Sequence, residues 1–133
     1  MLSMKSFVIV LVMAVSTLLV ACGGGATPAA SGTTAPSGTR EIQVDATEFK
    51  FTPGDQTFKA GEKIKVTVTN KGTVDHTWVL TDSSNKELFK MTIPVGKTVS
   101  QDLTVPTTPG AYIIVCDIAG HKEAGMTAKA TVQ

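Results

Sequence analysis

The chain has 133 residues, and its 12 lysine and arginine residues nearly balance 11 aspartate and glutamate residues, so the formal net charge is +1. A charge this close to zero, without a long block of one sign, excludes wholesale attraction to nucleic acid or to another strongly charged surface. We therefore expect no nucleic-acid partner. The region from Arg40 to Gln133 has the size of one small domain and is too short for two.

Residues 1–21 have the pattern of a secretory signal peptide. Met1–Lys5 has one positive charge, and Phe7–Ala21 is almost wholly apolar and shorter than the roughly 20 residues that span a bilayer. The segment ends in Leu19-Val20-Ala21-Cys22, which resembles a bacterial lipobox, in which Cys22 becomes the lipidated first residue of the mature protein. An uncleaved anchor and ordinary cleavage that leaves Cys22 as a thiol are the alternatives. All three predict export, and the lipobox predicts a lipid anchor on the extracytoplasmic or periplasmic side of a membrane.

Residues 22–39 predict a lipid-anchored flexible linker. After Cys22 the segment contains only glycine, alanine, serine, threonine and proline. Such a composition cannot bury enough apolar surface to fold. As a flexible coil, the linker would hold the next domain about 20 to 25 Å from its anchor. Loss of Lys5 with the signal peptide would remove one basic residue and leave the charges balanced.

The apolar residues after residue 39 recur with a period of two, which is typical of strands that have one face in a core. Four segments show this alternation, namely Ile42–Ala46, Ile64–Val68, Phe89–Ile93 and Met126–Val132. Turn-forming residues cluster between the predicted strands, at residues 52–55, 60–62, 70–72, 82–85 and 108–110. The pattern predicts an all-β domain of seven or eight strands, arranged as a sandwich or a barrel.

A predicted strand and the loop after it contain three side chains of metal-binding types. Ala111–Val115 is a dense apolar run, as in buried strands, and the chain becomes small and polar after Cys116. Cys116, His121 and Met126 are separated by four residues each, and a glycine before each of the last two lets the backbone fold back. A thiol, an imidazole and a thioether held together suit a thiophilic transition metal that takes a fourth ligand from elsewhere.

His76 is the candidate for the fourth ligand. In the predicted strand after Asp75, His76 shares a face with Trp78 and Leu80. Its imidazole needs a partner there, because an unpaired buried polar group costs about 1 to 3 kcal/mol. That partner is a metal in one interpretation and a backbone carbonyl in the other.

The sulfur-containing residues also have alternatives. After lipidation of Cys22, Cys116 would be the one free thiol in an oxidising compartment, and it would then be a metal ligand, a small buried hydrophobe or one half of a disulfide to Cys22. Met126 begins a core-facing alternation, so packing alone also accounts for it, as packing accounts for Met91. Metal ligation explains the thiol, both histidines and Met126 together.

These four residues resemble the ligand set of the blue (type 1) copper proteins, the cupredoxins of the plastocyanin and azurin group. Cys116, His121 and Met126 look like the C-terminal ligand loop of that family, and His76 looks like its upstream histidine. The spacing is most similar to that of auracyanin and rusticyanin. The resemblance implies a Greek-key β-sandwich over residues 40–133, with one type 1 copper ion per chain bound by these four side chains.

The resemblance also assigns roles beside the ligands. It implies a weak fifth contact from the carbonyl of Asp75. Thr77 stands where the family often has Asn or Ser donating a hydrogen bond to the thiolate, and this departure bears on the reduction potential. Ala119 stands where many members have proline, which implies a less rigid ligand loop.

The function implied by the resemblance is electron transfer by a membrane-tethered protein that cycles between Cu(II) and Cu(I) and exchanges electrons with redox protein partners. We expect no enzyme activity and no small-molecule substrate, because copper oxidases need additional histidines and this chain has two. Electrons are predicted to enter and leave near His121, on a rim that includes Ile118, Ala119 and Ala124, because a ligand on a loop tends to reach the surface. The alternatives are an extracytoplasmic copper-binding or delivery lipoprotein, although the chain lacks Met-rich or His-rich tracts, and a structural β-sandwich without a metal.

Overall fold

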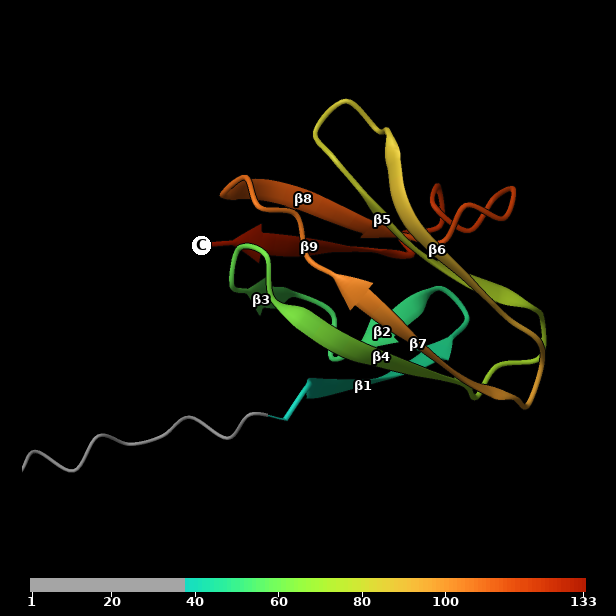
Figure 1. Cartoon of the computed structure of the whole chain (residues 1–133). Coiled ribbons are helices and arrows are strands. Elements are labelled where there is room, and N and C mark those ends of the chain that lie inside the picture. The colour runs from blue at the N-terminus through green and yellow to red at the C-terminus, as the bar shows by residue number, and fades with distance from the viewer. Residues whose placement is uncertain (1–37) are drawn as a thin grey trace, which may run out of the picture. The chain divides into compact units, whose positions relative to one another are not determined.

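The structure is a computed structural model and describes residues 38–133, which form nine strands and the loops that connect them (Figure 1). In chain order they are β1 (Arg40–Thr47), β2 (Lys50–Thr52), β3 (Gln56–Phe58), β4 (Lys63–Asn70), β5 (His76–Thr81), β6 (Glu87–Ile93), β7 (Thr98–Thr104), β8 (Gly110–Val115) and β9 (Thr127–Val132). The predicted signal peptide, and the predicted linker up to residue 37, lie outside the described residues. Within residues 38–133, no helix has the length and apolar character needed to cross a membrane.

The strands form two sheets that pack face to face. One sheet has the order β2-β1-β4-β7 and the other the order β3-β9-β8-β5-β6. The chain changes sheet on entering and on leaving β3, and again between β4 and β5, between β6 and β7, and between β7 and β8, as expected for Greek-key connections. Both sheets are mixed, because β1 pairs with β4 and β3 pairs with β9 in parallel. The predicted all-β sandwich is confirmed.

The strand count exceeds the seven or eight expected, because β2 and β3 contain only three residues each. Three residues are too few to show an alternation that stands out in the sequence. Both strands lie at sheet edges, on either side of the turn at residues 53–55. The short strands extend the sheets without changing the predicted architecture.

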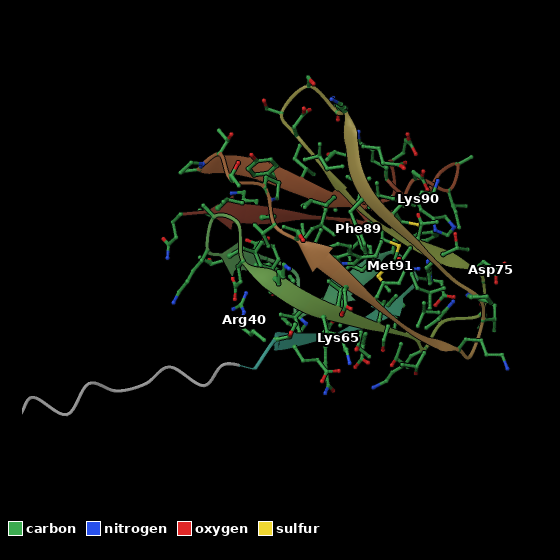
Figure 2. All side chains as sticks on the ribbon, in the orientation of Figure 1. Arg40, Lys65, Asp75, Phe89, Lys90 and Met91 are labelled. Atoms are coloured by element: carbon green, nitrogen blue, oxygen red, sulfur yellow. The ribbon has the colours of Figure 1, made fainter. Side chains whose placement is uncertain are left out.

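Residues predicted to face inward do form the core between the sheets. Ile64, Val66 and Val68 are fully buried along β4, and Met91 is buried on β6. Figure 2 labels Phe89, Lys90 and Met91 on β6, where Phe89 and Met91 pack on the core and Lys90 is exposed. Each buried aliphatic or aromatic side chain contributes about 1.5 to 3 kcal/mol, so burial of these alternating residues stabilises the sandwich.

Strand β5 differs from the other long strands, because all six of its residues are buried. Its inward face has Trp78, as predicted. On its outward face, Val79 and Thr81 line a hollow of about 250 Å³ together with Ile118 and Lys122 from the loop after β8. That loop therefore lies over the outer face of a strand that already has a neighbour on each side.

Candidate metal centre

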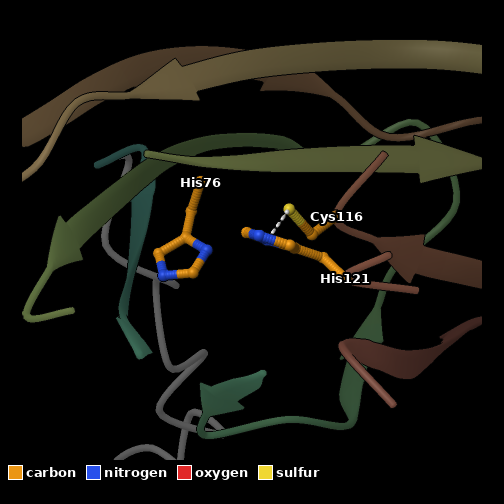
Figure 3. A group of neighbouring side chains, drawn as sticks. All are labelled: His76, Cys116 and His121. Atoms are coloured by element: carbon orange, nitrogen blue, oxygen red, sulfur yellow. Dashed lines mark hydrogen bonds between the residues drawn. The ribbon is translucent and has the colours of Figure 1, made fainter. Parts of the chain in front are cut away.

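Three of the predicted ligands meet at one end of the five-stranded sheet. Strands β5 and β8 are antiparallel, so the first residue of β5 and the residue after β8 lie at the same end. These residues are His76 and Cys116, and His121 reaches the same place from the following loop. One ligand atom from each lies within 4.8 Å of the other two, and Figure 3 shows the three side chains turned toward one another. His76 and Cys116 are fully buried, and His121 is 8% exposed.

His76 has no hydrogen-bond partner on either ring nitrogen among the described residues. The alternative in which a backbone carbonyl satisfies this imidazole is therefore not what the structure shows. Burial lowers the pKa of His76 below its usual value, and the neighbouring His121 lowers it further. A neutral imidazole with an available lone pair is the form that binds metal ions.

Cys116 and His121 face each other directly. The distance from Cys116 Sγ to His121 Nδ1 is 3.3 Å, and the ring centroids of His76 and His121 are 5.2 Å apart. The backbone N–H of Thr77 also donates to Cys116 Sγ, at 3.4 Å. Polar groups thus converge on this sulfur, which is not the surrounding of a cysteine that serves only as a small hydrophobe. The alternative disulfide involves Cys22, which lies outside the described residues.

The loop after β8 is closed by its own backbone hydrogen bonds. His121 N donates to Ile118 O at 3.0 Å, and Met126 N donates to His121 O at 2.9 Å. Cys116 N then donates to Met126 O at 3.1 Å, so the two ends of the loop lie side by side. The glycine before Met126, Gly125, has a φ of 100°, a region that other residues rarely adopt. The fold-back predicted from the glycines is present, and Met126 is fully buried beside Cys116.

A polar network joins the loop to the start of β5. Thr77 Oγ1 donates to Asp117 Oδ1 at 2.7 Å and accepts a hydrogen bond from Asp117 N at 2.9 Å. Lys90 on β6 forms an ion pair with the other carboxylate oxygen of Asp117, at 2.5 Å. Desolvation raises the pKa of Asp117, but hydrogen bonds from Lys90 and Thr77 outweigh it, so this pKa lies below its usual value. Nothing in the sequence points to Lys90 or Asp117, because their contact joins exposed polar residues far apart in the chain.

The remaining predicted site residues lie around this centre. The Asp75 carboxylate is exposed and accepts a hydrogen bond from Val95 N at 2.9 Å. In the loop, Ile118 is half-buried, and Ala119 and Ala124 are exposed. The predicted lipidation site, Cys22, lies outside the described residues.

Sequence reasoning missed Phe49, whose ring packs edge-on against His121. The two ring centroids are 5.1 Å apart with an interplanar angle of 77°, and Phe49 is 40% exposed. Phe49 lies between β1 and β2, in the sheet opposite to the one that leads into His121. A single apolar residue in a turn leaves no periodic signal, so only the fold reveals this contact.

The donor set fits a transition metal with affinity for sulfur and imidazole. A thiol and two imidazoles converge, a thioether is buried next to them, and one imidazole lacks any other partner among residues 38–133. Thiolate and thioether sulfur favour soft metal ions, and imidazole suits copper and zinc alike. The arrangement can hold such an ion in a site from which the protein excludes most water.

Comparison with known proteins supports the same fold. A family model described as a cupredoxin-like domain matches residues 10–128. A search of curated proteins finds no matching sequence.

Solved structures with the same fold include copper proteins. Auracyanin A, described as a "blue" copper protein from Chloroflexus aurantiacus, is 19% identical with a TM-score of 0.64, covering 72% of this chain and 100% of its own. Reduced rusticyanin is 22% identical with a TM-score of 0.55, covering 72% and 81%. A multi-copper oxidase from Pediococcus acidilactici is 12% identical with a TM-score of 0.59, covering 77% of this chain and 28% of its own. At these identities the likeness concerns the fold.

Proposed function

The chain belongs to the cupredoxin-like family, and we propose that it is a blue copper protein that transfers electrons between redox partners. His76, Cys116, His121 and Met126 are arranged as a type 1 copper site, and copper is the cofactor of this domain. The proposal is that each of these four side chains is a ligand. When bound, copper supplies one-electron chemistry, by alternating between Cu(II) and Cu(I).

The protein's part in this reaction is to hold the donors still and keep water out. A thiolate, two imidazoles and a thioether form a ligand set that both oxidation states of copper accept. His76 begins β5 and Cys116 directly follows β8, two paired strands of a packed sandwich, so their positions are fixed by the core rather than by the ion. The hydrogen bond from Thr77 N to Cys116 Sγ stabilises negative charge on the sulfur.

The observation that carries this proposal is the fully buried His76, with both ring nitrogens unpaired among the described residues, directed at a thiol and a second imidazole. The test is the visible spectrum of the purified, oxidised protein after addition of one equivalent of Cu(II). We expect an intense blue or green thiolate-to-copper band that is absent in Cys116→Ser. A colourless protein would overturn the proposal and favour a structural β-sandwich. A coloured protein that releases copper rapidly to a chelator would instead favour copper delivery.

We also propose that the protein acts at a membrane surface outside the cytoplasm. This proposal rests on the lipobox-like end of the signal peptide and on Cys22 as the lipidated residue. The linker would let the domain sample orientations over the membrane and meet redox proteins there. With electrons as the only species exchanged, the protein would be a carrier rather than an enzyme.

The proposed place of electron exchange is the surface near His121, formed by Ile118, Ala119 and Ala124. The exposure of Ala119 and Ala124 on the loop that holds a ligand supports this choice. Ala119→Asp should slow electron self-exchange between oxidised and reduced copies, because two like charges would meet at the contact, while the visible spectrum persists. Ala111→Asp is the matched control, since Ala111 is exposed on β8, near the end of that strand away from Cys116. Equal rates in the two variants would refute the assignment.

A further inference from the structure

Two other rings lie close to the imidazole of His121. The His76 ring lies with its centroid 5.2 Å away, and the Phe49 ring lies at 5.1 Å in an edge-to-face arrangement. Phe49 belongs to the β1–β2 turn of the four-stranded sheet, whereas His121 follows a strand of the five-stranded sheet. The contact therefore joins the two sheets at the metal centre.

The turn holds Phe49 in a conformation that its side chain does not favour. Its φ is 80°, in the left-handed region that non-glycine residues seldom adopt. The backbone N–H of Phe49 donates to Thr47 O at 3.0 Å, which closes a tight turn. Such a conformation persists only where surrounding contacts enforce it, and it is characteristic of functional sites.

The turn is tied to a neighbouring segment by the carboxylate of Glu48, the residue before Phe49. Glu48 Oε1 accepts hydrogen bonds from the backbone N–H and from the hydroxyl of Thr73. A Cβ atom added at Gly72 would lie 2.6 Å from this carboxylate, so glycine leaves the room that Glu48 occupies. We call this arrangement of Glu48, Gly72 and Thr73 the Glu48 clamp.

The Glu48 clamp acts on the segment that leads into β5. That segment is also fixed from within the fold, because the buried Asn70 side chain donates to Val74 O at 2.8 Å and to Ile93 O at 2.9 Å. The clamp thus connects the turn that carries Phe49 to the segment directly before His76. Phe49 in turn contacts His121.

The loop that carries His121 is tied to β5 and β6 at its start, through Asp117. Around His121 itself, the backbone hydrogen bonds are short-range and stay within residues 116–126. Phe49 packs against the imidazole from the opposite sheet and helps to leave it only 8% exposed. We propose that Phe49, held by the Glu48 clamp, is a positioning residue that fixes the His121 imidazole toward copper and shields it from water. This inference rests on the proposed copper site and adds to it a residue outside the ligand loop.

The test compares Phe49→Ala, Phe49→Tyr and Glu48→Ala in the full-length protein. In the metal-free protein, the ring-current shift of the His121 imidazole protons should vanish in Phe49→Ala and persist in Phe49→Tyr.

In the copper-loaded protein, Phe49→Ala should release copper to a chelator about two- to tenfold faster. This factor corresponds to the free energy that an aromatic pair contributes. The reduction potential of Phe49→Ala should fall, because water near His121 favours the more highly charged Cu(II). Phe49→Tyr should restore both values, and Glu48→Ala should speed copper release as Phe49→Ala does.

Two matched controls separate this role from general effects. Leu88→Ala removes an apolar side chain that is also 40% exposed, and Glu41→Ala removes a β1 carboxylate that also accepts a threonine hydroxyl, that of Thr67. Neither should change copper release or potential. A folded Phe49→Ala protein with wild-type imidazole shifts, copper release and potential would overturn the inference while leaving the copper site intact. A wild-type protein without the thiolate band would overturn the proposed function itself.

Discussion

His76 is a residue at which folding and metal binding have opposite requirements. It is fully buried, and neither of its ring nitrogens has a hydrogen-bond partner within residues 38–133. A buried polar group without a partner destabilises the folded state by about 1 to 3 kcal/mol. This destabilisation is present in the metal-free protein, and a metal ion bound to the imidazole removes it.

The first prediction follows from this conflict. His76→Leu, which replaces the imidazole by an apolar side chain, should raise the free energy of unfolding of the metal-free protein by about 1 to 3 kcal/mol. Copper should stabilise the wild-type protein and fail to stabilise the variant to the same extent. Urea unfolding of both proteins, with and without copper, measures these differences. If the metal-free His76→Leu protein were less stable than the wild type, the unpaired imidazole would not destabilise the folded state.

Thr77 has one hydroxyl proton and two acceptors near it. Its Oγ1 lies 2.7 Å from Asp117 Oδ1 and 3.5 Å from Cys116 Sγ, so the proton belongs to the carboxylate. The ion pair with Lys90 holds Asp117 in this position, and hydrogen bonding to Asp117 raises the pKa of Lys90. Of the two Thr77 donors, only the backbone N–H is then fully available to the sulfur.

The second prediction is that Asp117→Ala raises the reduction potential by releasing the Thr77 hydroxyl to the thiolate. Loss of a negative charge near copper would also raise the potential, so the substitution must be repeated in a Thr77→Val background. The rise should be larger by about 40 mV when Thr77 is present, equivalent to a hydrogen bond of about 1 kcal/mol in a one-electron couple. Voltammetry of the four proteins gives the difference. Equal rises in both backgrounds would assign the whole effect to charge.

At the scale of elements, the sequence predicted the long strands, but it did not predict that both faces of β5 are buried. Alternation identified β4 and β6 because each has one face in the core and one face in solvent. In β5 the residues of the outer face are also buried, and the loop after β8 lies over that face. The alternation of apolar and polar residues shows which side chains share a face of a strand. It does not show whether a loop from another part of the chain covers that face.

The site divides in a similar way. His76, Cys116 and His121 were found from the sequence, because few residue types bind soft metals and their spacing is distinctive. The Phe49 contact and the Glu48 clamp were not found, because both join segments that only the tertiary fold brings together. Local spacing therefore identified candidate ligands, and long-range packing determined what surrounds them.

The Glu48 clamp leads to a prediction about acid stability. The backbone hydrogen bond from Thr73 is the largest cause that lowers the pKa of Glu48, from 4.5 to about 2. A carboxyl with a lowered pKa in the folded state stabilises that state above pH 4.5, and the stabilisation is lost as the pH falls toward 2. Glu48→Gln should therefore lower the thermal midpoint at pH 7, and its difference from wild type should shrink over that acid range. Thermal scans of the metal-free proteins from pH 7 to pH 2 measure it, and a constant difference would contradict the clamp.

For the described domain as a whole, both sheets contribute to the metal centre. The five-stranded sheet provides His76 at the start of β5 and Cys116 directly after β8, and the four-stranded sheet provides the turn with Phe49. Because packed sheets resist deformation, ligands fixed at one end of the sandwich keep their places when charge changes between them. A stiff domain is suited to an ion that gains and loses an electron without rearrangement of its ligands.

The last prediction concerns how such a domain reaches its partners. If Cys22 is lipidated, the acyl chains hold the protein on the membrane, since two chains together give stable anchoring. Cys22→Ser should then move the protein from the membrane fraction to the soluble extracytoplasmic fraction, and the visible spectrum should stay unchanged because the copper ligands are untouched. Fractionation and intact-mass measurement of both proteins provide the test. A variant that stays in the membrane would indicate an uncleaved anchor, whereas a soluble, unlipidated wild-type protein would indicate ordinary cleavage. Either result would show that Cys22 is not a lipid anchor. Ordinary cleavage would also mean that the carrier meets its partners by free diffusion.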